Sequence, residues 1–105
     1  PHTPENHAIY SKVLAGSNGT TAAIDYLNKK IEEAPEVVVY KKALAEIFID
    51  TKNWNGARIL LENILTVKKE DKGAIMNLAL VYQQEGYVNR ALEMYLMAAS
   101  FDPLD

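Results

Sequence analysis

The chain has 105 residues, of which 49% are hydrophobic and 24% are charged, and its formal net charge is −3. This composition is typical of a folded domain, and the small negative charge argues against generic binding to nucleic-acid phosphates. The absence of cysteine excludes disulfide scaffolds, thiol catalysis and cysteine-ligated zinc. No apolar run is long enough to predict a membrane-spanning helix. We expect a soluble protein without direct membrane insertion, cytoplasmic or periplasmic, and a start at Pro1 suggests a piece of a longer protein.

The first part of the chain predicts two helices. Over 4–16, apolar side chains recur at helical spacing. The stretch GSNG at 16–19 then predicts a turn, because Gly and Asn are common helix breakers. A second helix is predicted over 20–34, and Pro35 ends it because the residue before proline favours an extended backbone.

Four more helices are predicted further along. Residues 36–52 open with three valines, which would suit a strand, but the length of the segment and its later apolar spacing favour a helix. The segments 53–69, 72–86 and 87–101 follow the same helical pattern. The sequence therefore predicts six helices in three antiparallel pairs, and no strand.

Capping residues mark several helix ends. Thr3 stands before Pro4 and predicts a helix start, since proline suits the first helical turn. Asn53 and Asp71 are good N-caps for the helices that follow them. Gly86 predicts a helix stop, because glycine readily takes the left-handed conformation found there.

Small residues repeat along the chain with a period of 34. Ala23, Ala57 and Ala91 are the first set, and the positions twelve residues earlier are also small: Ser11, Ala45 and Ala79. Large apolar or aromatic residues keep the same period; they include Tyr10, Leu14, Leu27, Phe48, Leu61, Tyr82 and Tyr95. We expect the small residues to let the helices of a pair approach closely and the large ones, notably Tyr10, Phe48, Leu61, Tyr82 and Tyr95, to fill the space between pairs.

This pattern resembles the tetratricopeptide repeat, a family whose repeat is 34 residues long. Three repeats, at 4–37, 38–71 and 72–105, would cover nearly the whole chain as a single domain. The middle repeat departs most from the family pattern, with Lys52 where the turn glycine is common and Lys69 where proline is usual. The resemblance implies an all-α fold, a right-handed α-solenoid of three helix-turn-helix repeats, acting as a non-catalytic protein-binding scaffold.

The resemblance also implies a concave groove lined by the first helix of each repeat. Its expected lining residues are Ala8, Lys12, Lys42, Glu46, Ile49, Met76, Asn77, Leu80, Gln83 and Gln84. One subgroup of the family grips chaperone carboxylates with Lys-x3-Asn and Lys-x3-Arg pairs. Here those places hold Ala8 with Lys12 and Met76 with Leu80, so we expect an extended or helical peptide and no chaperone tail. Met76 and Leu80 could equally serve in packing.

The last predicted helix is apolar on nearly every side. We expect part of it to be covered by a continuation of the chain, a second copy or a partner, and we favour a continuation in a longer parent protein, with self-association of this piece as a consequence. The residues available for self-association are Leu92, Leu96, Met97, Phe101 and Leu104, with Met94 beside them. Two alternatives to a groove-binding scaffold therefore stay open: a self-assembly module that forms homo-oligomers, or a regulatory segment of a larger enzyme.

The sequence predicts no catalytic residue, metal site or cofactor. His2 and His7 lie five residues apart, which is unsuitable for a metal-binding pair on a helix, and we expect a solvated terminus there. Paired acids at 32–33 and 70–71 fit solvated helix ends and caps. Trp54 is expected to pack in a turn. The middle repeat holds a mild basic cluster, which favours a solvated face over nucleic-acid binding; its members are Lys41, Lys42, Lys52, Arg58, Lys68 and Lys69.

Overall fold

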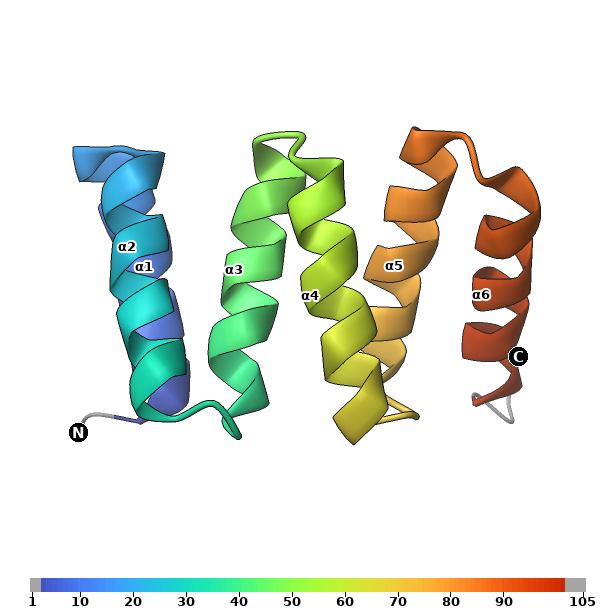
Figure 1. Ribbon diagram of the computed structural model, residues 1–105, viewed down its shortest axis with the longest axis horizontal. Coiled ribbons are helices and arrows are strands. Elements are labelled where there is room, and N and C mark those ends of the chain that lie inside the picture. The colour runs from blue at the N-terminus through green and yellow to red at the C-terminus, as the bar shows by residue number, and fades with distance from the viewer. Residues whose placement is uncertain (1–2, 102–105) are drawn as a thin grey trace.

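A computed structural model describes residues 3–101, and this part of the chain is entirely helical (Figure 1). Six helices follow one another and no strand occurs within the described range, which confirms the predicted fold class. The helices are α1 (Pro4–Asn18), α2 (Thr20–Glu33), α3 (Val38–Asp50), α4 (Trp54–Val67), α5 (Lys72–Glu85) and α6 (Val88–Ser100).

The helices form three hairpins that stack side by side. Helix α1 packs on α2, α3 on α4 and α5 on α6, while α2 meets α3 and α4 meets α5 between hairpins. The first hairpin lies at one end of the long axis and the third at the other (Figure 1). Each hairpin therefore contacts mainly its neighbours in sequence, which is the arrangement of a solenoid.

The predicted N-caps form as expected. Thr3 accepts a hydrogen bond from the backbone N–H of Asn6 at 3.1 Å, and Asn53 and Asp71 each accept one from the N–H three residues later at 3.0 Å. These bonds satisfy amide groups that a helix start leaves without an intrahelical partner.

The turns within hairpins correct one prediction and explain one substitution. GSNG is not a turn over its whole length, since α1 continues to Asn18 and the break falls at Gly19, where φ is 95°. Gly86 ends α5 in the left-handed conformation, as predicted. Lys52 lies one period earlier and also has a positive φ, of 63°. The middle repeat thus keeps the positive-φ turn that usually requires glycine, although the side chain of Lys52 makes this backbone conformation less favourable.

The six small residues of the repeat are all buried. Ser11, Ala23, Ala45, Ala57 and Ala79 have no exposed surface, and Ala91 is 3% exposed. The Ser11 hydroxyl donates to the carbonyl oxygen of Ala8 at 2.6 Å, so its burial leaves no polar group unsatisfied. Close approach of the helices is therefore possible at the same place in each hairpin.

The large residues behave as predicted with one exception. Leu61 and Tyr82 are buried, and Phe48 and Tyr95 are half-buried against the same core cluster. Tyr10 does not fill space between hairpins, because its side chain is 51% exposed on α1. The position is buried in the later repeats because the preceding hairpin covers it there, and no described residue precedes α1 in the stack.

Replacing Ala91 with leucine should lower the free energy of unfolding by about 1–3 kcal/mol, because the larger side chain overpacks a closed helix contact. The matched control is Ala99→Leu, which puts the same side chain on the exposed side of the same helix and should change stability by less than about 0.5 kcal/mol. Urea denaturation followed by circular dichroism measures both. Equal effects of the two substitutions would contradict the close contact at Ala91.

Candidate functional site

Four of the predicted groove residues come together between α1 and α3. Ala8 and Lys12 on α1 face Lys42 and Glu46 on α3, and all four line one cavity of about 220 Å³. The remaining lining residues are Ile9, Val39 and Ala43. The cavity therefore combines apolar side chains with charged groups, which suits an apolar side chain of a ligand flanked by polar contacts.

Two ion pairs link the first helices of successive repeats. Lys12 Nζ lies 2.7 Å from Glu46 Oε1 and ties α1 to α3. Lys42 donates to both carboxylate oxygens of Asp71, at 3.1 and 2.9 Å, and ties α3 to the start of α5. Both pairs are partly exposed, so we expect each to contribute at most about 1 kcal/mol to stability. Their main effect is to balance the two lysine charges within the groove.

Asp71 has two roles, helix cap and ion-pair partner. Burial by itself raises the pKa of this carboxyl, but the hydrogen bond from Lys42, the N–H of Ala74 and the nearby charges of Lys42 and Lys68 outweigh it, so the pKa lies below its ordinary value of 3.8. The side chain is therefore ionised at neutral pH.

The α5 part of the predicted groove is less tightly built. Helix α3 packs against α1, whereas its contact with α5 is weaker. Met76 is 42% exposed, Gln84 is exposed, and Asn77 and Leu80 are half-buried. Gln83 is exposed too, but its amide oxygen accepts a hydrogen bond from the Tyr95 hydroxyl at 3.2 Å.

Ile49, the remaining groove candidate, is half-buried against the core, so it contributes more to packing than to an open surface.

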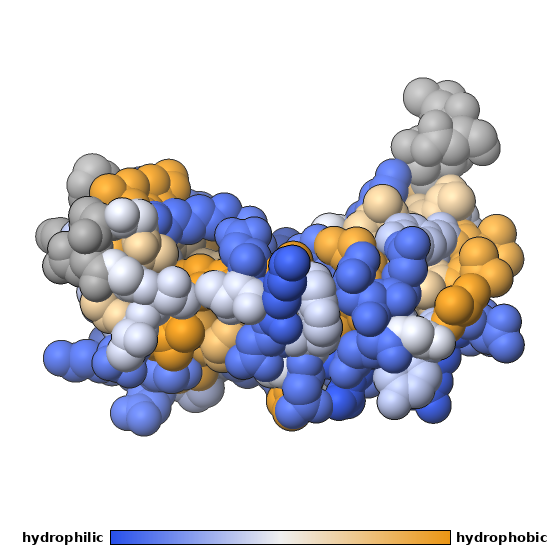
Figure 2. Space-filling model, turned by 90° about the horizontal axis from the view of Figure 1, so that it is seen from above, coloured by the Kyte–Doolittle hydropathy of each residue, from blue (hydrophilic) through white to orange (hydrophobic). Residues whose placement is uncertain are grey.

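Seen from above, the molecule is hollowed along one long side (Figure 2). Hydrophilic residues cover much of its middle in this view.

Three of the six residues in the basic cluster of the middle repeat make polar contacts with other side chains. Lys41 donates to Asn63 at 2.7 Å and Lys42 pairs with Asp71. Arg58 binds Glu85 on α5 at 3.1 Å and also contacts Glu62. The carboxylates beside Lys42 and Arg58 reduce the positive charge that these two residues offer to a phosphate backbone.

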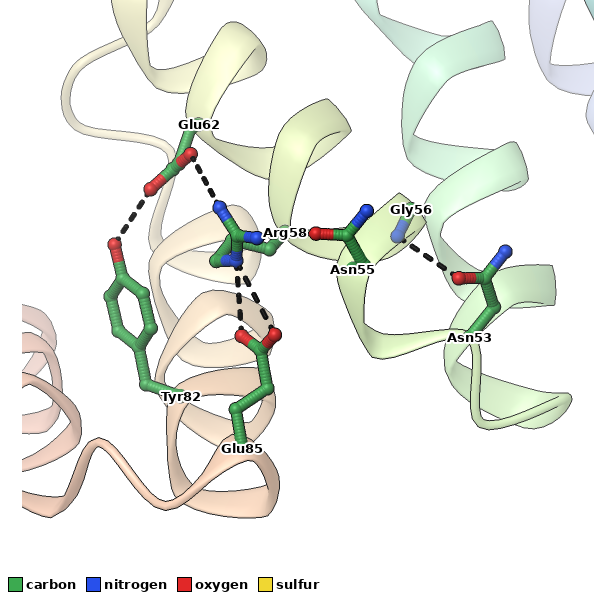
Figure 3. A network of polar contacts seen from close by, with 7 residues as sticks. All are labelled: Asn53, Asn55, Gly56, Arg58, Glu62, Tyr82 and Glu85. Atoms are coloured by element: carbon green, nitrogen blue, oxygen red, sulfur yellow. Dashed lines mark hydrogen bonds and ion pairs between the residues drawn. The ribbon is translucent and has the colours of Figure 1, made fainter.

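Arg58 belongs to a polar network that joins α4 to α5 (Figure 3). Glu62 lies 3.7 Å from Arg58 and accepts a hydrogen bond from the Tyr82 hydroxyl at 2.9 Å. Burial and the bond to Glu62 raise the pKa of Tyr82, so its hydroxyl stays protonated and donates. The network fixes how the second and third hairpins meet.

The last helix leaves several apolar side chains exposed. Leu92, Leu96 and Met97 are exposed by 61%, 73% and 40%. Phe101 is half-buried, and Leu104 lies outside the described residues. Met94 packs against the core, which corrects its assignment to the uncovered surface.

An aromatic cavity in the first hairpin was not predicted. It measures about 290 Å³ and is lined by Asn6, His7, Tyr10 and Tyr26. The rings of Tyr10 and Tyr26 lie 4.9 Å apart, and His7 contacts the Tyr26 hydroxyl through Nδ1. His7 is therefore part of a helix and half-buried, contrary to the expected solvated terminus; His2 lies outside the described residues. The sequence signal for this aromatic cavity was Tyr10, which stands at a position where the later repeats have leucine.

Between residues 3 and 101 there is no group of three His, Cys, Asp or Glu side chains that could hold a metal ion. No helix in that range is long and apolar enough to cross a membrane. Trp54 is half-buried against the core, in agreement with the packing role predicted for it.

The six helices in three hairpins fit three tetratricopeptide repeats, and the fold is a tetratricopeptide-like helical solenoid. Among solved structures, MamA of strain AMB-1 matches 98% of this chain with a TM-score of 0.80 and 13% identity. MamA from Desulfovibrio magneticus RS-1, residue 41 to the end, matches 98% of it with a TM-score of 0.81 and 19% identity. The chain spans 56% and 58% of these two proteins. No protein-family model and no curated protein matches the sequence. At such identities the likeness concerns the fold.

Asp71→Asn should weaken the fold in a pH-dependent way. Because the folded-state pKa is below the unfolded one, the ionised carboxylate stabilises the fold above pH 3.8, and this stabilisation is lost as the pH falls through the folded-state pKa. Asparagine keeps the cap but loses the pair with Lys42, so the variant should be less stable by about 0.5–1 kcal/mol near neutral pH.

The stability gap between Asp71→Asn and the unmodified chain should shrink in acid. Urea titrations near pH 7 and near pH 3 measure it. Glu70→Gln, which removes a charge from the exposed neighbouring residue, serves as the control and should show little pH-dependent gap. A gap at Asp71 that is equally large at both pH values would mean that the ion pair contributes nothing.

Proposed function

We propose that the chain is a non-catalytic scaffold of the tetratricopeptide type that binds a peptide or protein segment in the groove formed by α1, α3 and α5. The observation that carries the proposal is the 220 Å³ cavity between α1 and α3, which is lined by Ala8, Lys12, Lys42 and Glu46 among others. The solenoid fold supports the proposal because repeat arrays of this kind present extended concave surfaces.

The geometry suggests how a peptide would be held. An apolar side chain would enter the cavity against Ala8, Val39 and Ala43, where burial of about 100 Å² of apolar surface would contribute roughly 2.5 kcal/mol. Charged side chains of the ligand would form ion pairs with Lys12 or Glu46, which line the same cavity. Further along, Met76 and Gln84 are exposed on α5 and could hold the next part of an extended segment.

Ala8→Trp tests the cavity directly, because the indole ring would occupy the space that a ligand side chain needs. Peptides are first selected on the unmodified chain from a displayed random library, and their affinities are then measured by fluorescence polarisation. We expect at least a tenfold loss of affinity, or about 1.4 kcal/mol. Ile59→Trp adds the same ring at an exposed position of α4 away from the cavity and should leave the affinity unchanged.

Met76→Asp probes the second half of the groove on the same peptides. A carboxylate there should weaken binding of a segment that continues over α5, since it puts a charge where an apolar contact is expected. If neither Ala8→Trp nor Met76→Asp changes the affinity of the selected peptides, the groove is not the binding surface.

A further inference from the structure

The first helix of a hairpin turns one face toward the preceding hairpin. On α3 this face consists of Tyr40, Ala43, Leu44 and Ile47, and all four lie in one buried cluster with residues of α2. On α5 the corresponding face is buried by α4 in the same way, through Ala74, Leu78 and Val81. The stack therefore repeats one kind of interface, in which the second helix of one hairpin packs against the first helix of the next hairpin.

The equivalent face of α1 is uncovered. One period of 34 before the α3 residues stand Asn6, Ile9, Tyr10 and Val13. Ile9, Tyr10 and Val13 are exposed by 61%, 51% and 65%, whereas their α3 counterparts are buried. The 290 Å³ aromatic cavity opens beside Asn6 and Tyr10, so this face is also hollowed.

The opposite end of the stack carries the other half of the interface. In α4, Arg58 and Glu62 reach across to α5 (Figure 3). The same positions on α6, one period later, are Leu92 and Leu96, and both are exposed. Hydrophobic surface is visible at this C-terminal end of the molecule (Figure 2).

The two uncovered faces match in chemistry and in register. Glu62 bonds to Tyr82 of α5. One period after Glu62 stands Leu96 on α6, at one end of the stack. Two periods before Tyr82 stands Leu14 on α1, at the other end, and it is half-buried. At this position the interface between the second and third hairpins has a polar contact, whereas both end faces carry a leucine. Stacking in the same register would therefore bury leucine against leucine without leaving an unpaired charge.

We propose that copies of this chain associate head to tail, with α6 of one copy covering the α1 face of the next. The occupant of the α1 face is thus a second copy. Such a contact uses two different surfaces, so it leaves one of each free and can add further copies. The proposal goes beyond peptide binding in the groove and does not depend on it.

Two variants with complementary blocks test the arrangement. Val13→Glu blocks the α1 face and leaves α6 free, while Leu96→Glu blocks α6 and leaves the α1 face free. Both positions are exposed, so the fold should tolerate the changes, which circular dichroism checks. Sedimentation velocity should show concentration-dependent association of the unmodified chain, and each variant alone should associate at least tenfold more weakly. An equimolar mixture should form a one-to-one dimer that does not grow, because it combines one free face of each kind.

Ile59→Glu provides the control, since it adds the same charge at an exposed position of α4 that belongs to neither face, and it should associate like the unmodified chain. A symmetric contact between two α6 helices would instead leave Val13→Glu fully associated and the mixture no larger than its components, and this result overturns the proposal. An unmodified chain that stays monomeric at the highest accessible concentration overturns it as well, since something other than a copy would then cover these faces.

Discussion

The whole architecture depends on the close approach of helices at six small residues. Each hairpin has one pair of them, Ser11 with Ala23, Ala45 with Ala57, and Ala79 with Ala91, and all are buried. A longer side chain at any of these places would push two helices apart, and the displacement would pass to the next hairpin because each hairpin is positioned only by its neighbours. The period of 34 therefore reflects a spatial constraint, namely that each hairpin must place its small residues at the same helix contact. This repetition sets the first helices in a row along the candidate groove. It also sets the direction in which the two ends of the stack face.

Once the small residues set the spacing, the chemistry between hairpins is free to vary. The second and third hairpins share an apolar core cluster, and beside it lies a polar network of Arg58, Glu62, Tyr82 and Glu85, which adds a specific register at little net stability. The first and second hairpins meet mainly through apolar residues, with the Lys12–Glu46 pair at the groove side. The same geometric position thus holds an arginine on α4 and a leucine on α6. In the proposed head-to-tail contact, this exposed leucine would be covered by the next copy, as the arginine is covered by the next hairpin.

The sequence was most informative where structure is set locally. The helix caps at Thr3, Asn53 and Asp71 and the stop at Gly86 depend on side chains within a few residues of the backbone groups that they satisfy, and all were predictable. The burial of Tyr10 was predicted wrongly because the periodic pattern gives a residue's direction in the repeat but not whether a neighbouring hairpin covers it. The pairing of Lys42 with Asp71, and the aromatic cavity, join residues from different helices whose relative rotation is set by packing. Four of the groove residues could be named in advance only because the resemblance to the tetratricopeptide repeat implies which helix positions line its groove.

In the proposed head-to-tail assembly, the groove and the ends of the stack would be geometrically coupled. Head-to-tail association in the internal register would place α1 of the next copy where a further first helix belongs, so the first helices of successive copies would form one continuous row. The groove would then lengthen with each added copy, and the cavity between α1 and α3 would recur along it. A partner carrying several copies of a weakly binding segment would gain from this through effective concentration, since its second segment binds without a new encounter. Peptide binding and self-association would then strengthen each other, because a multivalent partner binds the assembled state better than the single chain and shifts the equilibrium toward it.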